Sequence, residues 1–268
     1  MIKPSSGWRP INWKELWHYK DLLYFLVWRD IKSRYAQSVL GIGWAVIQPV
    51  FSMIVFTVVF GKMAKIDSNG VPYAIFSFTA LVPWTYFAGS LSASSGSLLG
   101  ASGMMTKVYF PRLIIPLAPV ISKLIDFLIA LILLACMMYY FGFSPSIEII
   151  YLPFLILLMM FTASGLGMWF TALSIQYRDI KYGMGFFVQL LMYAAPVVYP
   201  SSNVPDAYRS IYGLFPMAGV IEGFRAVLLQ TIKIPWDLIS TGTVVSLLLF
   251  ITGSFYFRRM EKYFADVA

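Results

Sequence analysis

The 268-residue sequence contains a single cysteine, Cys136, and a single histidine, His18. One cysteine cannot form a disulfide within the chain, and no His, Cys and carboxylate residues cluster as in a metal site. His18 stands among charged residues near the N-terminus, where a solvated or interfacial role is expected. No serine is paired with a histidine inside an apolar segment, as a membrane-embedded protease would require. We therefore predict no catalytic residue and no metal ligand in this chain.

Charged residues are also scarce, at 12% of the chain against about 25% in ordinary soluble domains. Each of six runs without charge is long enough for a helix to cross about 30 Å of hydrocarbon, which takes about 20 apolar residues. The second half of the 68–106 run is too rich in Ser and Gly to form a second lipid-facing helix. We predict an all-α integral membrane protein with transmembrane helices at about 37–61, 71–91, 113–141, 148–175, 182–199 and 236–257.

Four regions follow from these spans. Residues 1–35 form an N-terminal cytoplasmic or interfacial amphipathic segment, 36–260 the six-span membrane domain, and 261–268 a cytoplasmic tail. Within the membrane domain, 200–235 is too long for a turn and too apolar for a solvated loop. Two short helices at 208–214 and 217–229, broken at Phe215-Pro216, are expected there as a re-entrant pair on the exterior side.

Basic residues set the orientation. Of the 20 Lys and Arg, 15 fall before the first span or after the second, fourth and sixth spans, all on one side of the membrane. Because cytoplasmic loops carry an excess of Lys and Arg, both termini are expected in the cytoplasm. The net charge of +8 is interpreted as topology and contact with anionic membrane lipid, and nucleic acid is not an expected partner.

A phosphate-binding loop is also missing. The one Gly-Lys pair, Gly61-Lys62, is followed by Met63 and has Phe56 where the first glycine of the motif belongs. This chain is therefore not expected to hydrolyse ATP. An ion-driven carrier would place ionisable residues in several spans, and here Lys123 and Asp126 are the candidates. Their spacing puts them on one helical face, where a structural ion pair is favoured over a proton relay.

The segment before the first span has helical periodicity. Its charged residues include Lys14, His18, Asp21 and Lys32, and its apolar face is predicted to hold Leu16, Leu23, Val27 and Ile31. The segment is expected to lie in the membrane interface, anchored by its tryptophans. Membrane anchoring and docking of a cytoplasmic partner both fit this pattern.

Six motifs carry a resemblance to a known family. They are Leu40-Gly-Ile-Gly-Trp-Ala-Val-Ile-Gln-Pro49, Lys107-Val-Tyr-Phe-Pro-Arg-Leu-Ile-Ile-Pro116, Tyr177-Arg-Asp-Ile180, Ala195-Pro-Val-Val-Tyr-Pro200, Phe215-Pro-Met217 with Glu222-Gly-Phe-Arg225, and Arg258-Arg-Met-Glu-Lys-Tyr-Phe-Ala-Asp266. In this order, they resemble the ABC-2 permeases that export O-antigen and related polysaccharides across the bacterial inner membrane. The similarity runs from about residue 20 to the C-terminus. Teichoic-acid export permeases are similar over the same motifs.

The resemblance implies a homodimer that binds two copies of a separate ATPase subunit, which holds the ATP and magnesium. It also implies a substrate linked through a pyrophosphate to undecaprenol, passing through an aromatic-lined channel. An N-terminal helix at 13–35 and a coupling helix at about 95–107 would contact the ATPase. An ion-gradient-driven flippase for lipid-linked sugars is the less favoured alternative, and a membrane-embedded enzyme comes third.

Candidate residues follow from the resemblance. Channel candidates are the mid-span aromatics of the first and fifth spans, Phe51, Phe56, Phe186, Phe187 and Tyr193, for which packing or lipid contact is the alternative. Exterior gate candidates are Glu222 and Arg225, expected to face each other or water. Candidates for the ATPase interface are Arg29, Lys32, Lys107, Arg178 and Asp179, where the last two are expected to fix a cytoplasmic turn.

Overall fold

The computed structural model describes residues 13–36, 40–41, 43–105, 109–144 and 146–261, and every regular element in these ranges is a helix. The α-helices are α1 (Trp13–His18), α2 (Lys20–Tyr35), α3 (Gly43–Phe56), α4 (Tyr73–Ser95), α5 (Ser97–Gly100), α6 (Ser102–Met105), α7 (Ile114–Phe141), α8 (Leu152–Gln176), α9 (Arg178–Ala194), α10 (Asp206–Gly213), α11 (Pro216–Leu229) and α12 (Trp236–Met260). A π-helix, η1 (Thr57–Met63), continues α3, and the 3-10 helices η2 (Ile147–Tyr151) and η3 (Ser201–Asn203) precede α8 and α10.

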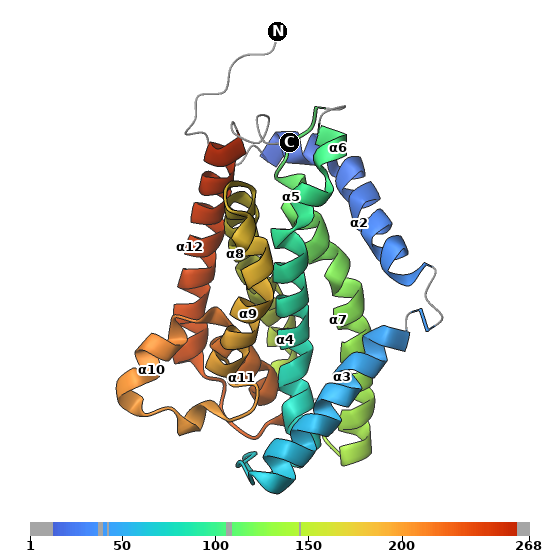
Figure 1. Cartoon of the computed structure of the whole chain (residues 1–268). Helices are drawn as coiled ribbons and strands as arrows, with labels where there is room; N and C mark the ends of the chain where they lie inside the picture. The colour runs from blue at the N-terminus through green and yellow to red at the C-terminus, as the bar shows by residue number, and fades with distance from the viewer. Residues whose placement is uncertain (1–12, 37–39, 42, 106–108, 145, 262–268) are drawn as a thin grey trace.

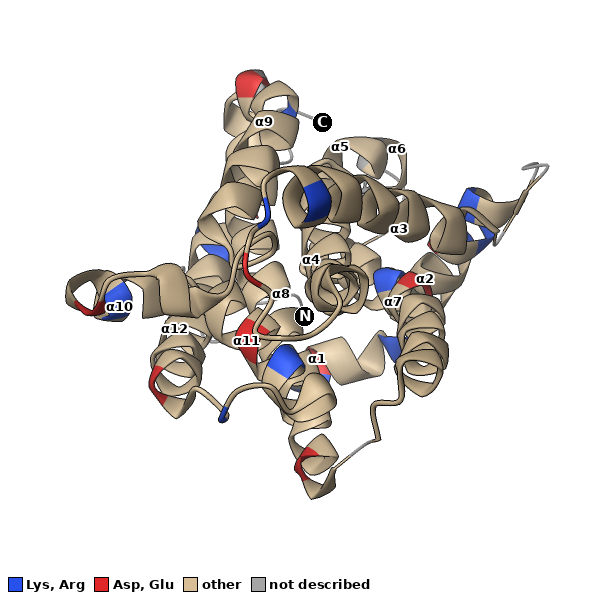
Figure 2. Cartoon of the chain, turned by 90° about the horizontal axis from the view of Figure 1, so that it is seen from below, with Lys and Arg blue, Asp and Glu red and all other residues tan. Residues whose placement is uncertain are grey.

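The long helices run side by side between two ends of a bundle (Figure 1). At the upper end in Figure 1 lie the start of α2, the short helices α5 and α6, the junction of α8 with α9, and the last turn of α12. Helices α10 and α11 and the far end of α3 lie at the lower end. In the view from that lower end, most of the residues are uncharged (Figure 2).

Five segments are long and apolar enough to cross a membrane, namely 43–63, 73–95, 114–141, 147–176 and 236–260. Helix α9 has 17 residues, which at 1.5 Å per residue gives about 26 Å, slightly less than a hydrocarbon core. It nevertheless runs from the upper end toward the lower end, because α8 returns the chain to the upper end and α10 lies at the lower. Helices α10 and α11 meet at a bend of 105° and stay at the lower end. With α9 added to these five segments, the described chain has six helices that run along the bundle, of which the α3–η1 helix slants from about mid-height to the lower end (Figure 1).

Helix bounds differ from the predicted spans by a few residues. Helix α4 continues to Ser95 through a Ser-rich stretch, and α9 covers 178–194 in place of the predicted 182–199. Residues 195–200 leave the helix because Ala195 is extended and Pro196 follows it. The predicted coupling segment at 95–107 holds two single turns, α5 and α6.

Helix α4 is the centre of the core. Its apolar side chains pack against α7, α8 and α11, with Phe78 and Phe87 fully buried among them. Small polar side chains join it to its neighbours: Thr171 Oγ1 donates to the Ser94 carbonyl at 2.7 Å, and Ser174 Oγ donates to the Ser95 carbonyl at 2.8 Å. In an apolar surrounding, such hydroxyls stabilise helix pairs that the hydrophobic effect does not bring together.

Glycines allow α8 and α12 to approach closely. A Cβ atom added at Gly165 would lie 2.6 Å from the backbone of Leu249 and Phe250, and one at Gly253 would lie 2.5 Å from the Gly165 carbonyl oxygen. No side chain fits at either position without moving a helix axis. This seam places α12 next to the core span α8.

Candidate functional site

The first and fifth crossings present the least buried apolar faces. In its most apolar stretch, the α3–η1 helix has 6% of its residues buried, whereas α4 has 78%. On α9, a Cβ atom added at Gly183 or Gly185 would meet no atom within 4 Å, and Tyr182 beside them is exposed. Neither face is covered within the described part of this single chain.

The five aromatic channel candidates divide into two groups. Phe51, Phe186 and Tyr193 are exposed, at 64%, 67% and 55%. Phe56 packs edge-on against Phe60, with ring centroids 5.4 Å apart, and Phe187 packs against Phe170 at 5.1 Å. Thus three of the five side chains point away from the chain's own core. The other two, Phe56 and Phe187, are partly buried and pack against it.

The exterior gate candidates lie inside the protein. Glu222 and Arg225 are one turn apart on α11, face each other with 2.9 Å between Arg225 Nη1 and Glu222 Oε1, and are 1% and 0% exposed. The Arg225 guanidinium also stacks on the Phe76 ring of α4, 3.6 Å from its centroid. Of the two expected arrangements, contact with each other or with water, the structure has the first: the two side chains form a buried ion pair.

This pair binds the backbone that follows α9. Arg225 Nη2 donates to the Val197 carbonyl at 3.0 Å and Nη1 donates to the Tyr199 carbonyl at 3.3 Å, while Glu222 Oε1 accepts from the Ser201 amide at 3.0 Å. Charged partners make these hydrogen bonds strong and replace the water that a buried, irregular backbone would need. The two residues therefore connect the end of α9 to α11.

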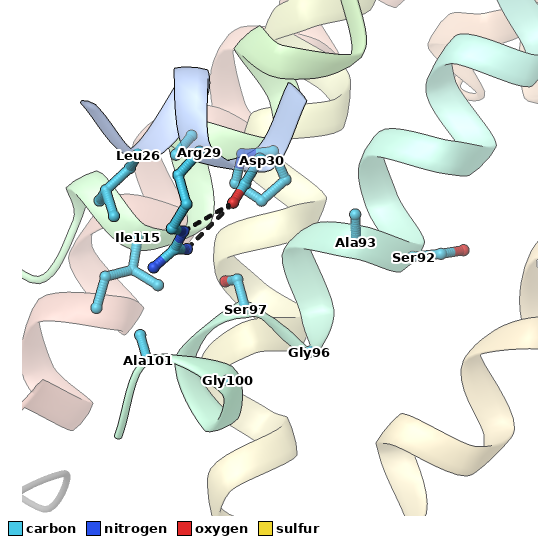
Figure 3. A pocket seen from close by; sticks show the side chains of 12 residues that line it. Leu26, Arg29, Asp30, Ser92, Ala93, Gly96, Ser97, Gly100, Ala101 and Ile115 are labelled. Atoms are coloured by element: carbon cyan, nitrogen blue, oxygen red, sulfur yellow. Dashed lines mark hydrogen bonds and ion pairs between the residues drawn. The ribbon is translucent and has the colours of Figure 1, made fainter. Parts of the chain in front are cut away.

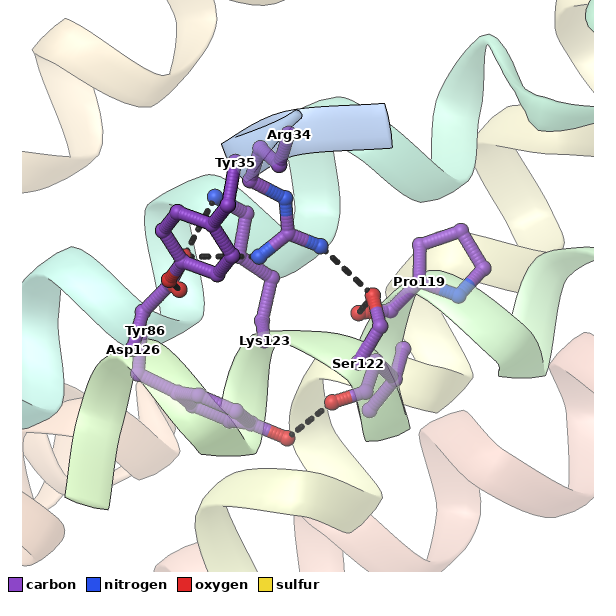
Figure 4. Close-up of polar contacts among 8 residues, drawn as sticks. Arg34, Tyr35, Tyr86, Pro119, Ser122, Lys123 and Asp126 are labelled. Carbon is purple, nitrogen blue, oxygen red and sulfur yellow. Dashed lines mark hydrogen bonds and ion pairs between the residues drawn. The ribbon is translucent and has the colours of Figure 1, made fainter. Parts of the chain in front are cut away.

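Lys123 and Asp126 form the ion pair that their spacing predicts, with Lys123 Nζ 2.9 Å from Asp126 Oδ2. Two residues that the sequence did not indicate complete the cluster (Figure 4). Arg34 Nη1 donates to Asp126 Oδ2 at 2.8 Å, and the Tyr35 hydroxyl donates to Oδ1 of the same carboxylate. Burial, and then the hydrogen bond to Asp126, raises the pKa of Tyr35 to about 12, so its hydroxyl stays a donor at neutral pH.

Helices α1 and α2 cover most of the N-terminal segment that the sequence predicts to lie in the membrane interface. Helix α2 slants down the side of α7 and does not lie across the end of the bundle (Figure 1). Its buried side chain is Leu26, which packs on Ile114 and Ala118, while Leu16, Leu23 and Val27 of the predicted apolar face are partly buried around it. Arg34 and Tyr35 bind Asp126 of α7, which lies 92 and 91 residues later in the chain, and these contacts direct α2 along α7. Helical periodicity within the segment cannot predict a contact with so distant a residue.

The described candidates for the ATPase interface lie at two levels of the bundle: Asp179 at the upper end, and Arg29 and Lys32 in the second half of α2, which slants toward the middle of α7. Arg29 pairs with its neighbour Asp30 at 3.1 Å, and Lys32 is exposed on the same helix. Asp179 is exposed in the first turn of α9, where a carboxylate is favourable to the helix dipole. Arg178 begins α9 with its side chain outside the described part, and Lys107 lies outside the described residues.

A groove of about 390 Å³ separates α2 from the ends of α4 and α5. Small residues of α4 and α5, among them Ala93, Gly96 and Gly100, form one wall, and Leu26, Arg29 and Asp30 line the other (Figure 3). Within the described residues, no group of three His, Cys, Asp or Glu side chains is placed to hold a metal ion.

This chain is similar to known proteins over most of its length. The family model for the ABC-2 type transporter matches residues 21–229. The O-antigen export system permease protein RfbA of Myxococcus xanthus is 26% identical over 254 residues, covering 93% of this chain and 96% of the relative. A protein of the same name from Klebsiella pneumoniae is 25% identical, with 92% and 95% covered. The polysialic acid transport protein KpsM of Escherichia coli is 20% identical, with 72% and 76% covered. With most of its length matched by the family model and an all-helical fold of membrane-spanning length, the chain belongs to the ABC-2 type transporter family.

Proposed function

We propose that this chain is the transmembrane permease subunit of an ATP-driven ABC transporter that exports lipid-linked polysaccharide of the O-antigen type across the bacterial inner membrane. The observation that carries the proposal is the match to O-antigen export permeases over more than nine-tenths of both chains. A match of this extent leaves less than one-tenth of the chain uncovered, so the likeness is not limited to one part of the membrane domain.

Energy enters from a partner in this proposal. Two copies of a cytoplasmic ATPase subunit bind the ATP and magnesium, because the chain itself has no phosphate-binding motif. They contact the end formed by α1, α5, α6 and the start of α9, near Arg29, Lys32, Lys107, Arg178 and Asp179. The termini are cytoplasmic by the excess of basic residues on that side.

The exposed faces of α3 and α9 support a homodimer with a channel between the two copies. Helices with apolar side chains are stable in lipid, but two faces of low burial, on helices that both pack against α4, suit contact with a second copy. Phe51, Phe186 and Tyr193 are then the residues proposed to contact sugar rings, with Phe56 and Phe187 behind them. The substrate is carried on undecaprenyl pyrophosphate, and α10 and α11 close the exterior side.

Deleting the gene in its host tests the proposal. We expect surface polysaccharide to disappear and undecaprenyl-linked glycan to accumulate inside the cell, with wild-type complementation restoring both. Surface glycan at the wild-type level, with no internal accumulation, would contradict the proposal. If a lipid-linked teichoic acid accumulated, the assignment to an ABC transporter would stand, and the substrate would be teichoic acid and not O-antigen polysaccharide.

A capsule polysaccharide is a second candidate substrate. It is favoured by the similarity to KpsM and to the capsule polysaccharide export inner-membrane protein CtrC of Neisseria meningitidis, which is 21% identical over 85% of this chain. The two candidates differ in the glycan that accumulates after deletion, so sugar analysis of that lipid-linked material separates them.

A further inference from the structure

The C-terminal turn of α2 is bound to the middle of α7. Arg34 spans one helical turn of α7, donating from Nη1 to Asp126 at 2.8 Å and from Nη2 to Ser122 Oγ at 2.8 Å. Tyr35 donates to the other oxygen of the same carboxylate, and Lys123 approaches from α7 itself (Figure 4). One carboxylate thus receives three donors, two of them from α2.

This cluster differs from an ordinary surface ion pair because it lies near the middle of an apolar helix. Asp126 is the thirteenth of the 28 residues of α7, and the side chains of Arg34, Lys123 and Asp126 are about one-quarter exposed. In an apolar surrounding, an ionised group without a partner is strongly unfavourable, so removing one member leaves the others poorly compensated. The cluster therefore fixes α2 at a defined depth along α7.

A second contact holds α2 on α7 about two turns earlier. Leu26 is 2% exposed and packs on Ile114 and Ala118. On its other flank, α2 is separated from α4 and α5 by the open groove (Figure 3). Helix α2 is thus bound to α7 at two levels and has free space toward α4 and α5.

The first crossing follows this cluster in the sequence. Tyr35 is eight residues before Gly43, where α3 begins, and α3 packs against α4 and α7. The cluster therefore fixes α2 to α7, a helix that α3 also contacts. No comparable ion pair within the described part of α3 holds it to the bundle.

We propose that Asp126 is a positioning residue for transport, the socket through which Arg34 and Tyr35 join α2 to the middle of α7, a helix on which α3 also packs. A displacement of α2 at the ATPase end is then delivered to the middle of α7 and to α3, both inside the membrane. The proposal rests on the ATP-driven function proposed above. It assigns the Lys123–Asp126 pair to force transmission and not to proton movement.

The test uses the full chain copurified with its ATPase partner and compares Asp126→Asn, Asp126→Glu and Tyr35→Phe with Asp67→Asn. Asp67 is an exposed carboxylate in the loop between η1 and α4, outside the proposed ATPase contacts, so Asp67→Asn is the matched loss of charge. We expect Asp126→Asn to retain ATP hydrolysis within about twofold and to lose export by tenfold or more. Asp126→Glu should recover part of the export, Tyr35→Phe should lose several-fold, and Asp67→Asn should match wild type.

A structural readout separates this inference from the function on which it rests. A spin label at Ser33, exposed on α2, should become more mobile in Asp126→Asn and Tyr35→Phe but not in Asp67→Asn. Increased mobility with unchanged export per ATP would overturn the coupling role. Unchanged mobility would overturn the socket itself. Absence of export in wild type would refute the proposed function, while the mobility measurement would still decide the socket. If Asp126→Asn is not inserted in the membrane, Tyr35→Phe, which keeps every charge, decides both points.

Discussion

Helices α3 and α4 are consecutive crossings with opposite surroundings. The α3–η1 segment is the more apolar of the two, yet it has 6% of its most apolar stretch buried against 78% for α4. Helix α4 contains seven serine and threonine residues, whereas α3 is dominated by Val, Ile and Phe. Hydropathy thus locates a membrane crossing without indicating whether lipid, a partner or the protein interior surrounds it.

The difference shows which side chains determine how the helices of this fold pack together. Apolar side chains are equally stable in lipid and in protein, so hydroxyls, glycines and ion pairs determine which helices meet. The hydroxyls of Thr171 and Ser174 and the glycines at 165 and 253 define the interior around α4, α8 and α12. On the open face of α9, by contrast, Gly183 and Gly185 have no atom within 4 Å of an added Cβ, so these glycines bring no neighbouring helix of the described chain into close contact.

The largest effect is expected from breaking the buried pair on α11. Arg225→Met leaves the carboxyl group of Glu222 without its partner in the core, and should lower stability by about 3–5 kcal/mol. The double variant Arg225→Met with Glu222→Leu should be less destabilised than the single one. Thermal denaturation of the detergent-solubilised protein measures both.

The matched control for this pair is Arg209→Met. Arg209 and Asp237 are also oppositely charged and 2.5 Å apart, but their side chains are 35% and 51% exposed, so about 0–1 kcal/mol is expected. Equal loss in Arg209→Met and Arg225→Met would show that burial is not what distinguishes the two pairs.

A smaller effect is expected at the α8–α12 seam. Gly165→Ala places a methyl group 2.6 Å from the Leu249 backbone and should destabilise the protein by about 1–3 kcal/mol, because the helices must separate. Gly183→Ala makes the same chemical change on the open face of α9, where the higher helix propensity of alanine should leave stability equal or slightly increased. Differential scanning fluorimetry of the two variants compares them; a loss at Gly183 as large as at Gly165 would mean that the α9 face is covered.

The sequence predicted those features that depend on local pattern. Charge-free runs located the crossings, Phe215-Pro216 located the bend between α10 and α11, and the i to i+3 spacings of Lys123–Asp126 and Glu222–Arg225 gave both ion pairs. These features need only a helix and a membrane thickness. The bounds of α9 were less accurate because its end depends on how residues 195–200 are bound by Arg225.

Contacts between distant segments could not be predicted in the same way. Arg34 and Asp126 are 92 positions apart, and Lys123 already neutralises Asp126 locally, so nothing in the sequence required a third partner. The slant of α2 and the groove beside it follow from that contact. Likewise, the burial of Arg225 requires Phe76 of α4 and the carbonyls after α9 to converge on it, an arrangement of three separate segments.

The smallest effect on stability is expected from the outer aromatic faces, where function should respond instead. Phe51→Ala and Phe186→Ala each remove a ring that is about two-thirds exposed in the chain, so folding should change by less than about 1 kcal/mol. Ile132→Ala on α7 is the matched control, because Ile132 is 66% exposed and is not aromatic. If α3 and α9 line a channel for sugar rings, export in cells should fall several-fold for the two Phe variants and stay at the wild-type level for Ile132→Ala, at equal protein in the membrane. Equal export in all three would place these aromatic faces against lipid. The low burial of α3 would then reflect only its place at the edge of the bundle.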